Sequence, residues 1–241
     1  MSMVHTKKAM KLAKGWTHDF LHLFFPHNCT GCGSDVVSPD QMLCLHCLSE
    51  LPATDFFSHP GNPVEKNFYG RLPLRHAAAA YFFTKESLIQ HLIVQLKYRG
   101  NKEIGVYMGN LMGHIISKAA QFNDVDVLVP LPLNPRREKK RGYNQATALC
   151  NGIAESWGKP VIDKVAYRKV YTETQTQMGR INRWENMDGV FAVNDTAPLH
   201  GKHILLVDDV VTTGATLEAC GSELLKIPGA TLSIATLAYT L

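Results

Sequence analysis

The sequence predicts an α/β fold in which helices flank an open, largely parallel sheet, preceded by a small metal-binding module. Two observations predict the sheet: short apolar runs alternate with helix-like segments after residue 76, and two of these runs end in polar sequence. Alternating strands and helices imply crossover connections and therefore parallel strands. Two Cys-x-x-Cys pairs predict the module. We expect the module and an N-terminal helix over residues 1–52, a linker over 53–75, and the α/β domain over 76–241.

The composition supports a folded chain without a membrane span. Hydrophobic residues make up 45% of the 241 positions and charged residues 19%, which excludes a wholly disordered chain. No apolar run approaches the roughly 18 to 20 residues that cross a bilayer. Residues 6–25 combine lysines with an interrupted apolar stretch, so they predict a basic amphipathic helix rather than an export signal. We therefore expect a cytoplasmic protein whose thiols are reduced.

The paired cysteines predict a zinc site. Cys29 and Cys32 form one pair, Cys44 and Cys47 the other, and eleven residues separate the pairs. Two such turns bring four thiolates around one ion, and an all-sulfur tetrahedral site suits Zn²⁺ and leaves no open position for catalysis. The zinc would be structural. Two disulfides are the metal-free alternative, which a reducing compartment disfavours.

Apolar periodicity places the elements of the larger domain. Strands are predicted over residues 77–83, 126–132, 202–209 and 230–240, and helices over 86–100, 103–120, 144–157 and 214–226. Ligands bind beyond the carboxyl ends of the strands in such sheets. The polar sequences that follow the second and third strands are therefore the predicted site.

The third of these strands carries the most informative motif. Asp208 and Asp209 follow the apolar run 204–207, and a small-residue loop, 212–216, opens the next helix. Free N–H groups and the helix dipole at such a loop favour a phosphate. Two adjacent carboxylates need donors or a cation, which the vicinal hydroxyls of a ribose and a Mg²⁺ held by a pyrophosphate would supply. The motif therefore predicts a binder of ribose 5-phosphate. A plain strand-turn-helix corner with capping side chains is the alternative.

Several motifs together resemble a known family. VDDVVTTGAT (207–216) looks like the phosphoribosyl pyrophosphate (PRPP) motif of type I phosphoribosyltransferases. Together with KYRG (97–100), VPLPLNPRREKKRGYNQA (129–146), TETQTQMGRINRWEN (172–186) and the Cys-x-x-Cys pairs, it resembles the ComF family. These are competence-associated, phosphoribosyltransferase-like proteins linked to DNA uptake and use.

The resemblance implies roles for individual residues. Asp208 and Asp209 would be the catalytic, ribose-binding pair. The phosphate would lie on Val210, Val211, Thr212, Thr213, Gly214, Ala215 and Thr216. The pyrophosphate loop would comprise Pro130, Leu131, Arg137, Arg141, Asn144 and Gln145, with Lys97 and Arg99 as further phosphate contacts, and a lid would contain Thr174, Gln175, Arg180 and Arg183. A solvated basic turn or a nucleic-acid patch is the alternative for the basic stretch 136–141, and an ordinary surface loop is the alternative for the lid.

The resemblance also implies function. It implies Mg²⁺-dependent PRPP binding and a link to DNA uptake, natural transformation or the use of imported DNA. If the chain is catalytic, a nitrogen nucleophile would displace pyrophosphate from PRPP. The sequence does not indicate which residues would bind this nucleophile. The rival hypothesis is a non-catalytic accessory protein that binds single-stranded DNA or nucleotides and works with the DNA-uptake machinery. A transcriptional regulator on the same fold is a third reading.

Overall fold

The computed structural model describes residues 28–38, 40–169 and 189–240. It divides the chain into two compact units, one ending at Glu50 and the other beginning at Leu51. In the first unit, the described residues form turns and the short helix α2 (Leu45–Ser49). The second unit contains all the strands of the described ranges.

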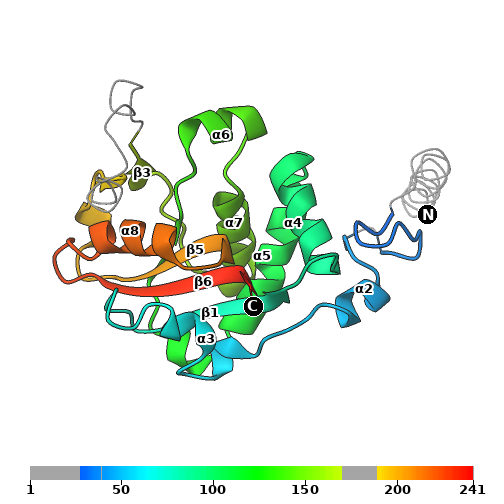
Figure 1. Cartoon of the computed structure of the whole chain (residues 1–241), viewed down its shortest axis with the longest axis horizontal. Helices are drawn as coiled ribbons and strands as arrows, with labels where there is room; N and C mark the ends of the chain where they lie inside the picture. Colours follow the sequence, from blue (N-terminus) through cyan, green and yellow to red (C-terminus); the bar gives the residue numbers. More distant parts are fainter. Residues whose placement is uncertain (1–27, 39, 170–188, 241) are drawn as a thin grey trace, which may run out of the picture. The chain divides into compact units, whose positions relative to one another are not determined.

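The main sheet is parallel, as predicted. Its four strands are β1 (Ala77–Phe83), β2 (Val127–Pro130), β5 (His203–Val211) and β6 (Thr231–Thr240), in the order β1-β6-β5-β2 (Figure 1). All three pairings between neighbouring strands are parallel. The α/β fold class is therefore confirmed.

Strand β5 pairs over different lengths with its two neighbours. β5 pairs with β6 from His203 to Val211, but with β2 only as far as the pair Pro130 and Val207. From residue 208 onward β5 therefore has a hydrogen-bonded neighbour on one side only. This open edge is where the sequence places its acidic pair.

Helices cover the sheet where the periodicity predicts them. They are α4 (Leu88–Tyr98), α5 (Lys102–Ile116), α7 (Gln145–Trp157) and α8 (Ala215–Leu224). Helices α5 and α7 lie side by side (Figure 1) and approach closely through glycine. A Cβ atom at Gly152 would lie only 1.9 Å from the carbonyl oxygen of Val106, so this contact requires glycine.

Several short elements have no counterpart in the prediction. They are α3 (Pro63–Lys66), α6 (Pro135–Arg141), the antiparallel pair β3 (Ala166–Arg168) and β4 (Phe191–Val193), and the single-turn helices η1 (Phe56–Ser58), η2 (Ala120–Phe122) and η6 (Ala197–Leu199). Helix α6 has no buried residue, so it carries no apolar periodicity.

The segment expected as a linker, 53–75, is part of the folded core. Val64, Phe68 and Leu72 are buried in the same hydrophobic cluster as residues of β5, β6 and α8. Their spacing of four residues matches one face of a helix, but the prolines at 60, 63 and 73 indicated turns, which explains why the sequence analysis took the segment for a linker.

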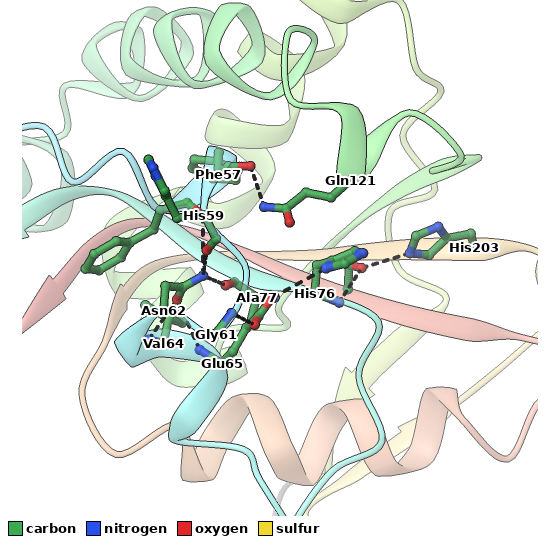
Figure 2. Close-up of polar contacts among 12 residues, drawn as sticks. Phe57, His59, Gly61, Asn62, Val64, Glu65, His76, Ala77, Gln121 and His203 are labelled. Atoms are coloured by element: carbon green, nitrogen blue, oxygen red, sulfur yellow. Dashed lines mark hydrogen bonds and ion pairs between the residues drawn. The ribbon is translucent and has the colours of Figure 1, made fainter.

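Asn62 anchors this segment to the sheet (Figure 2). Its side-chain amide donates to the carbonyl oxygens of Phe56, His59 and Ala77, the last at 2.8 Å. Its Oδ1 accepts from the N–H groups of Val64 and Glu65 and so caps α3. One buried side chain thus satisfies five backbone groups.

A second buried polar cluster lies at the start of β5. His203 Nδ1 lies 3.0 Å from Asp124 Oδ1, and His203 Nε2 lies 2.8 Å from Ser233 Oγ. The Ser233 oxygen also accepts the N–H of His76. Neutral His203 fits this arrangement, since its Nε2 accepts the Ser233 hydroxyl proton while Nδ1–H donates to Asp124.

The free energy of unfolding should decrease as the pH is lowered, because of His203. Burial is the main cause that lowers the pKa of His203 below its ordinary value of 6.5, although the Asp124 carboxylate opposes the shift. The unfolded chain therefore binds more protons, and stability present above pH 6.5 is lost as the pH falls through the shifted pKa. Urea unfolding between pH 7 and pH 5 should show this decrease, and His203→Gln should reduce it. The exposed His200→Gln is the control; an equal pH slope in the wild type and His203→Gln would refute the assignment.

Candidate functional site

The acidic pair lies inside β5 rather than after it. The prediction ended the strand at residue 209, but β5 continues to Val211, and Asp208 pairs with Thr236 of β6. Neighbouring strand residues point to opposite faces of a sheet. The two carboxylates therefore point to opposite faces of the sheet at the open edge of β5, which increases the distance between their charges.

Asp209 forms a buried ion pair. Its Oδ1 lies 2.8 Å from Lys97 Nζ at the end of α4, and its side chain is only 4% exposed. The second carboxylate oxygen, Oδ2, is buried and has no hydrogen-bond partner among the described residues. A buried unpaired oxygen is costly, so this atom is available to a donor or cation brought by a ligand.

Asp208 is half-buried and electrostatically strained. Burial raises the pKa of Asp208 well above its usual range, and the charge of Asp209 raises it further, while Lys97 and Arg141 act in the opposite direction. The ionised form thus lacks sufficient compensation from the residues that the structure describes. A cation or a pair of hydroxyl donors would supply what is missing.

The loop 212–216 joins β5 to α8. Thr212, Thr213 and Thr216 are exposed, whereas Gly214 is buried and has a φ angle of 76°. Val211 differs from the other predicted phosphate contacts, because its side chain packs in the hydrophobic core. Val210, near the end of β5, and Ala215, the first residue of α8, are also predicted contacts, and both are half-buried.

A basic cavity lies beside the acidic pair. It has a volume of about 530 Å³ and is lined by Lys97, Tyr98, Gly100, Arg137, Lys140 and Arg141. The guanidinium of Arg141 lies 5.8 Å from the centre of the exposed Tyr98 ring. The structure thus brings Lys97, Tyr98 and Gly100 of KYRG together with two of the predicted pyrophosphate-binding arginines, although more than thirty positions separate them in the sequence. Arg99, the other predicted phosphate contact in KYRG, does not line this cavity.

The remaining residues of the predicted pyrophosphate loop do not line this cavity. Asn144 caps α7 and donates to the carbonyl oxygen of Leu131 at 2.9 Å, and Gln145 accepts from Arg141. Both side chains are buried; Asn144 supports the loop after β2, whereas Gln145 supports Arg141. Pro130 and Asn144 line a second cavity of about 510 Å³, which also includes Tyr167. The predicted lid residues lie outside the described residues, as does the N-terminal helix.

The four clustered cysteines form a site suited to a metal. Their sulfur atoms lie within 4.8 Å of one another, and those of Cys32 and Cys44 are 3.7 Å apart. Tetrahedral metal–sulfur bonds of about 2.3 Å place sulfur atoms about 3.8 Å apart, so the spacing fits a single ion. All six cysteines of the chain are free thiols.

Hydrogen bonds prepare one of these thiols as a ligand. Burial is the largest single effect on Cys29 and raises its pKa, but hydrogen bonds from backbone N–H groups, that of Cys44 first, lower it overall to about 6. The N–H of Cys44 lies 3.2 Å from Cys29 Sγ. A thiolate is the form that binds metals.

The described ranges also bear on membrane insertion. None of their helices combines the length and apolar character that crossing a bilayer requires.

Comparison with known proteins identifies the family. Residues 139–240 match the family model for the phosphoribosyl transferase domain. The chain is 30% identical over 203 residues to the DNA utilization protein YhgH of Salmonella typhimurium, covering 83% of this chain and 85% of the relative. It is 28% identical over 205 residues to competence protein ComFC of Bacillus subtilis, covering 79% and 81%. The chain belongs to the ComF family.

The domain match in this ComF-family chain covers α7, β5, α8 and β6. It therefore contains the acidic pair and the 212–216 loop, whereas Lys97 and the four clustered cysteines lie before it. Among solved structures, glutamine PRPP amidotransferase from B. subtilis, complexed with ADP and GMP, aligns with a TM-score of 0.40. The sequence identity is 16%, over 58% of this chain and 30% of that one.

Proposed function

We propose that this ComF-family chain binds PRPP together with Mg²⁺ on the open edge of β5. The observation that carries the proposal is the undercompensated acidic pair: Asp209 has a buried oxygen without a partner in the part of the chain that the structure describes, and burial raises the pKa of Asp208. A ribose diol supplies two donors to such a pair. The 212–216 loop lies beside this pair and includes the N-terminus of α8, where the 5-phosphate would bind.

The basic cavity suits the other end of the same ligand. A pyrophosphate carries several negative charges, and arginine forks bind such groups in a bidentate manner. Arg137, Arg141 and Lys97 would hold it there. Mg²⁺ would be held by the pyrophosphate oxygens and an aspartate, and when bound it neutralises leaving-group charge.

This arrangement supports phosphoribosyl transfer. A nitrogen nucleophile would form a bond to C1 of the ribose while the bond from C1 to the pyrophosphate oxygen breaks, and the nucleophile would lose its proton. Positive charge develops on the sugar during this step. Asp208 and Asp209 would orient the ribose, and the cationic side chains would stabilise the departing pyrophosphate.

Replacing both aspartates tests the proposal. Asp208→Asn with Asp209→Asn should weaken PRPP binding, measured by calorimetry with Mg²⁺, at least about 100-fold, because charged hydrogen bonds to the diol are lost. Asp208→Asn alone should unfold at a similar or higher temperature, because it removes the charge that burial disfavours. The control is Glu103→Gln with Glu155→Gln, which neutralises two exposed carboxylates. Unchanged PRPP affinity in the aspartate variant would contradict the ribose assignment.

We also propose that Zn²⁺ occupies the cysteine cluster and organises the module expected over residues 1–52. The sulfur spacing supports this, and the zinc would be structural. Because thiolate ligands must stay reduced, we place the protein in the cytoplasm.

Metal analysis tests the zinc proposal. We expect about one zinc per chain in protein purified under reducing conditions, and substantial loss of that zinc in Cys44→Ser. Cys220→Ala, which removes a buried thiol outside the cluster, should keep the metal. Zinc-free wild type after purification without chelators would refute the site.

A second candidate function is binding of single-stranded DNA during DNA use. The names of the relatives and the exposed basic helix α6 favour it. Binding through α6 should weaken steeply with salt, and Arg136→Gln with Lys139→Gln should reduce that slope. Absence of DNA binding at low salt would exclude this role.

A further inference from the structure

We propose that Arg71 is the positioning residue that aims the 212–216 loop at its phosphate ligand. The inference rests on the proposed function, because it concerns the same site. Arg71 belongs to the segment expected as a linker, and 142 positions separate it from the loop carbonyl that it contacts.

Two side chains hold the loop by its carbonyl oxygens. Arg71 Nη1 donates to the carbonyl oxygen of Thr213 at 2.9 Å and to that of Asn67 at 2.8 Å. Asn67 Nδ2 donates to the carbonyl oxygen of Thr212 at 3.1 Å. Consecutive carbonyls of the loop are therefore bound on the same side by one short turn of the chain.

These contacts fix the direction of the N–H groups. The C=O and N–H of a trans peptide unit lie in one plane and point in opposite directions. Holding the carbonyls of Thr212 and Thr213 toward the 67–71 turn therefore directs the N–H groups of Thr213 and Gly214 away from it. Within the described residues, neither N–H has a hydrogen-bond acceptor. Two preoriented donors thus face the side where the 5-phosphate would bind.

Arg71 also neutralises an unfavourable charge. Its Nη2 forms an ion pair with the carboxylate of Glu218, in the first turn of α8. An unpaired carboxylate there would repel an anion at the N-terminus of the helix. Arg71 therefore makes the loop more favourable for phosphate in two ways, through geometry and through charge.

The experiment compares two ligands that occupy different parts of the proposed site. Calorimetry with the full chain would measure ribose 5-phosphate and pyrophosphate separately. We expect Arg71→Met to weaken ribose 5-phosphate binding at least about tenfold and to leave pyrophosphate binding unchanged. A general loss of structure would affect both ligands. Adding Glu218→Gln to Arg71→Met should recover part of the ribose 5-phosphate affinity, because it removes the unpaired charge.

Arg75→Met is the matched control. Arg75 is a partly exposed arginine on the same segment, and it pairs with Asp124 instead of contacting the loop. If Arg71→Met does not fold, Asn67→Ala, which removes only the contact to Thr212, should weaken ribose 5-phosphate binding several-fold.

The possible outcomes separate the two proposals. If Arg71→Met or Asn67→Ala binds ribose 5-phosphate with the affinity of the wild type, the positioning role alone is overturned. Wild type that binds neither ligand would overturn the proposed function, and the positioning role with it.

Discussion

Gly214→Ala should lower the affinity for PRPP at least about 30-fold. A residue with a side chain is strained by about 1–2 kcal/mol at the φ angle of 76° that Gly214 adopts. The added Cβ would also lie 2.7 Å from the ring of Phe68, which is buried in the core and cannot move away freely. The loop would have to shift, and its N–H groups would no longer converge. Calorimetry with PRPP and Mg²⁺ measures the loss.

Gly158→Ala is the control for a glycine-to-alanine substitution at a positive φ angle outside the loop. Gly158 has a φ angle of 74°, but no atom lies within 4 Å of the Cβ position. This control therefore carries the same backbone strain without the steric clash, and it should bind PRPP like the wild type. Wild-type PRPP affinity in Gly214→Ala would show that the loop does not hold the ligand.

Asn62→Ala should have the largest effect on stability. The substitution leaves several buried backbone groups without partners, each at a cost of about 1–3 kcal/mol. We expect a loss of at least about 3 kcal/mol in the free energy of unfolding, measured in urea. Because the same segment carries Arg71, ribose 5-phosphate binding should weaken as well.

Asn101→Ala provides the comparison for Asn62→Ala. Asn101 also caps a helix, α5, but within residues 28–38, 40–169 and 189–240 its side chain makes a single hydrogen bond, to the N–H of Ile104. Its loss should cost about 1 kcal/mol. Equal costs for the two variants would contradict the anchoring role of Asn62.

The regular elements were predictable because their residues repeat. Strand β1 occupies the predicted residues 77–83, and α7 differs from its prediction by one residue. Strand β5 extends further than predicted, because two aspartates interrupt its apolar run although their backbones still pair with β6. Charged side chains at a sheet edge do not prevent backbone pairing, and the apolar pattern alone cannot show this.

The missing parts of the prediction depend on contacts between distant residues. Asn62 and Arg71 lie in irregular sequence, and their importance comes from partners on other elements. The ion pair of Lys97 with Asp209 likewise joins α4 to β5. The motif at 207–216 revealed the acidic pair and the loop, but no local pattern revealed what holds them in place.

A crystal structure of the protein with PRPP and Mg²⁺ would show whether β5 and the 212–216 loop bind PRPP. We expect 5-phosphate oxygens about 3 Å from the backbone nitrogens of Thr213 and Gly214, and ribose hydroxyls on the carboxylates of Asp208 and Asp209. A ligand bound elsewhere, with Asp209 Oδ2 still unpartnered, would contradict this expectation.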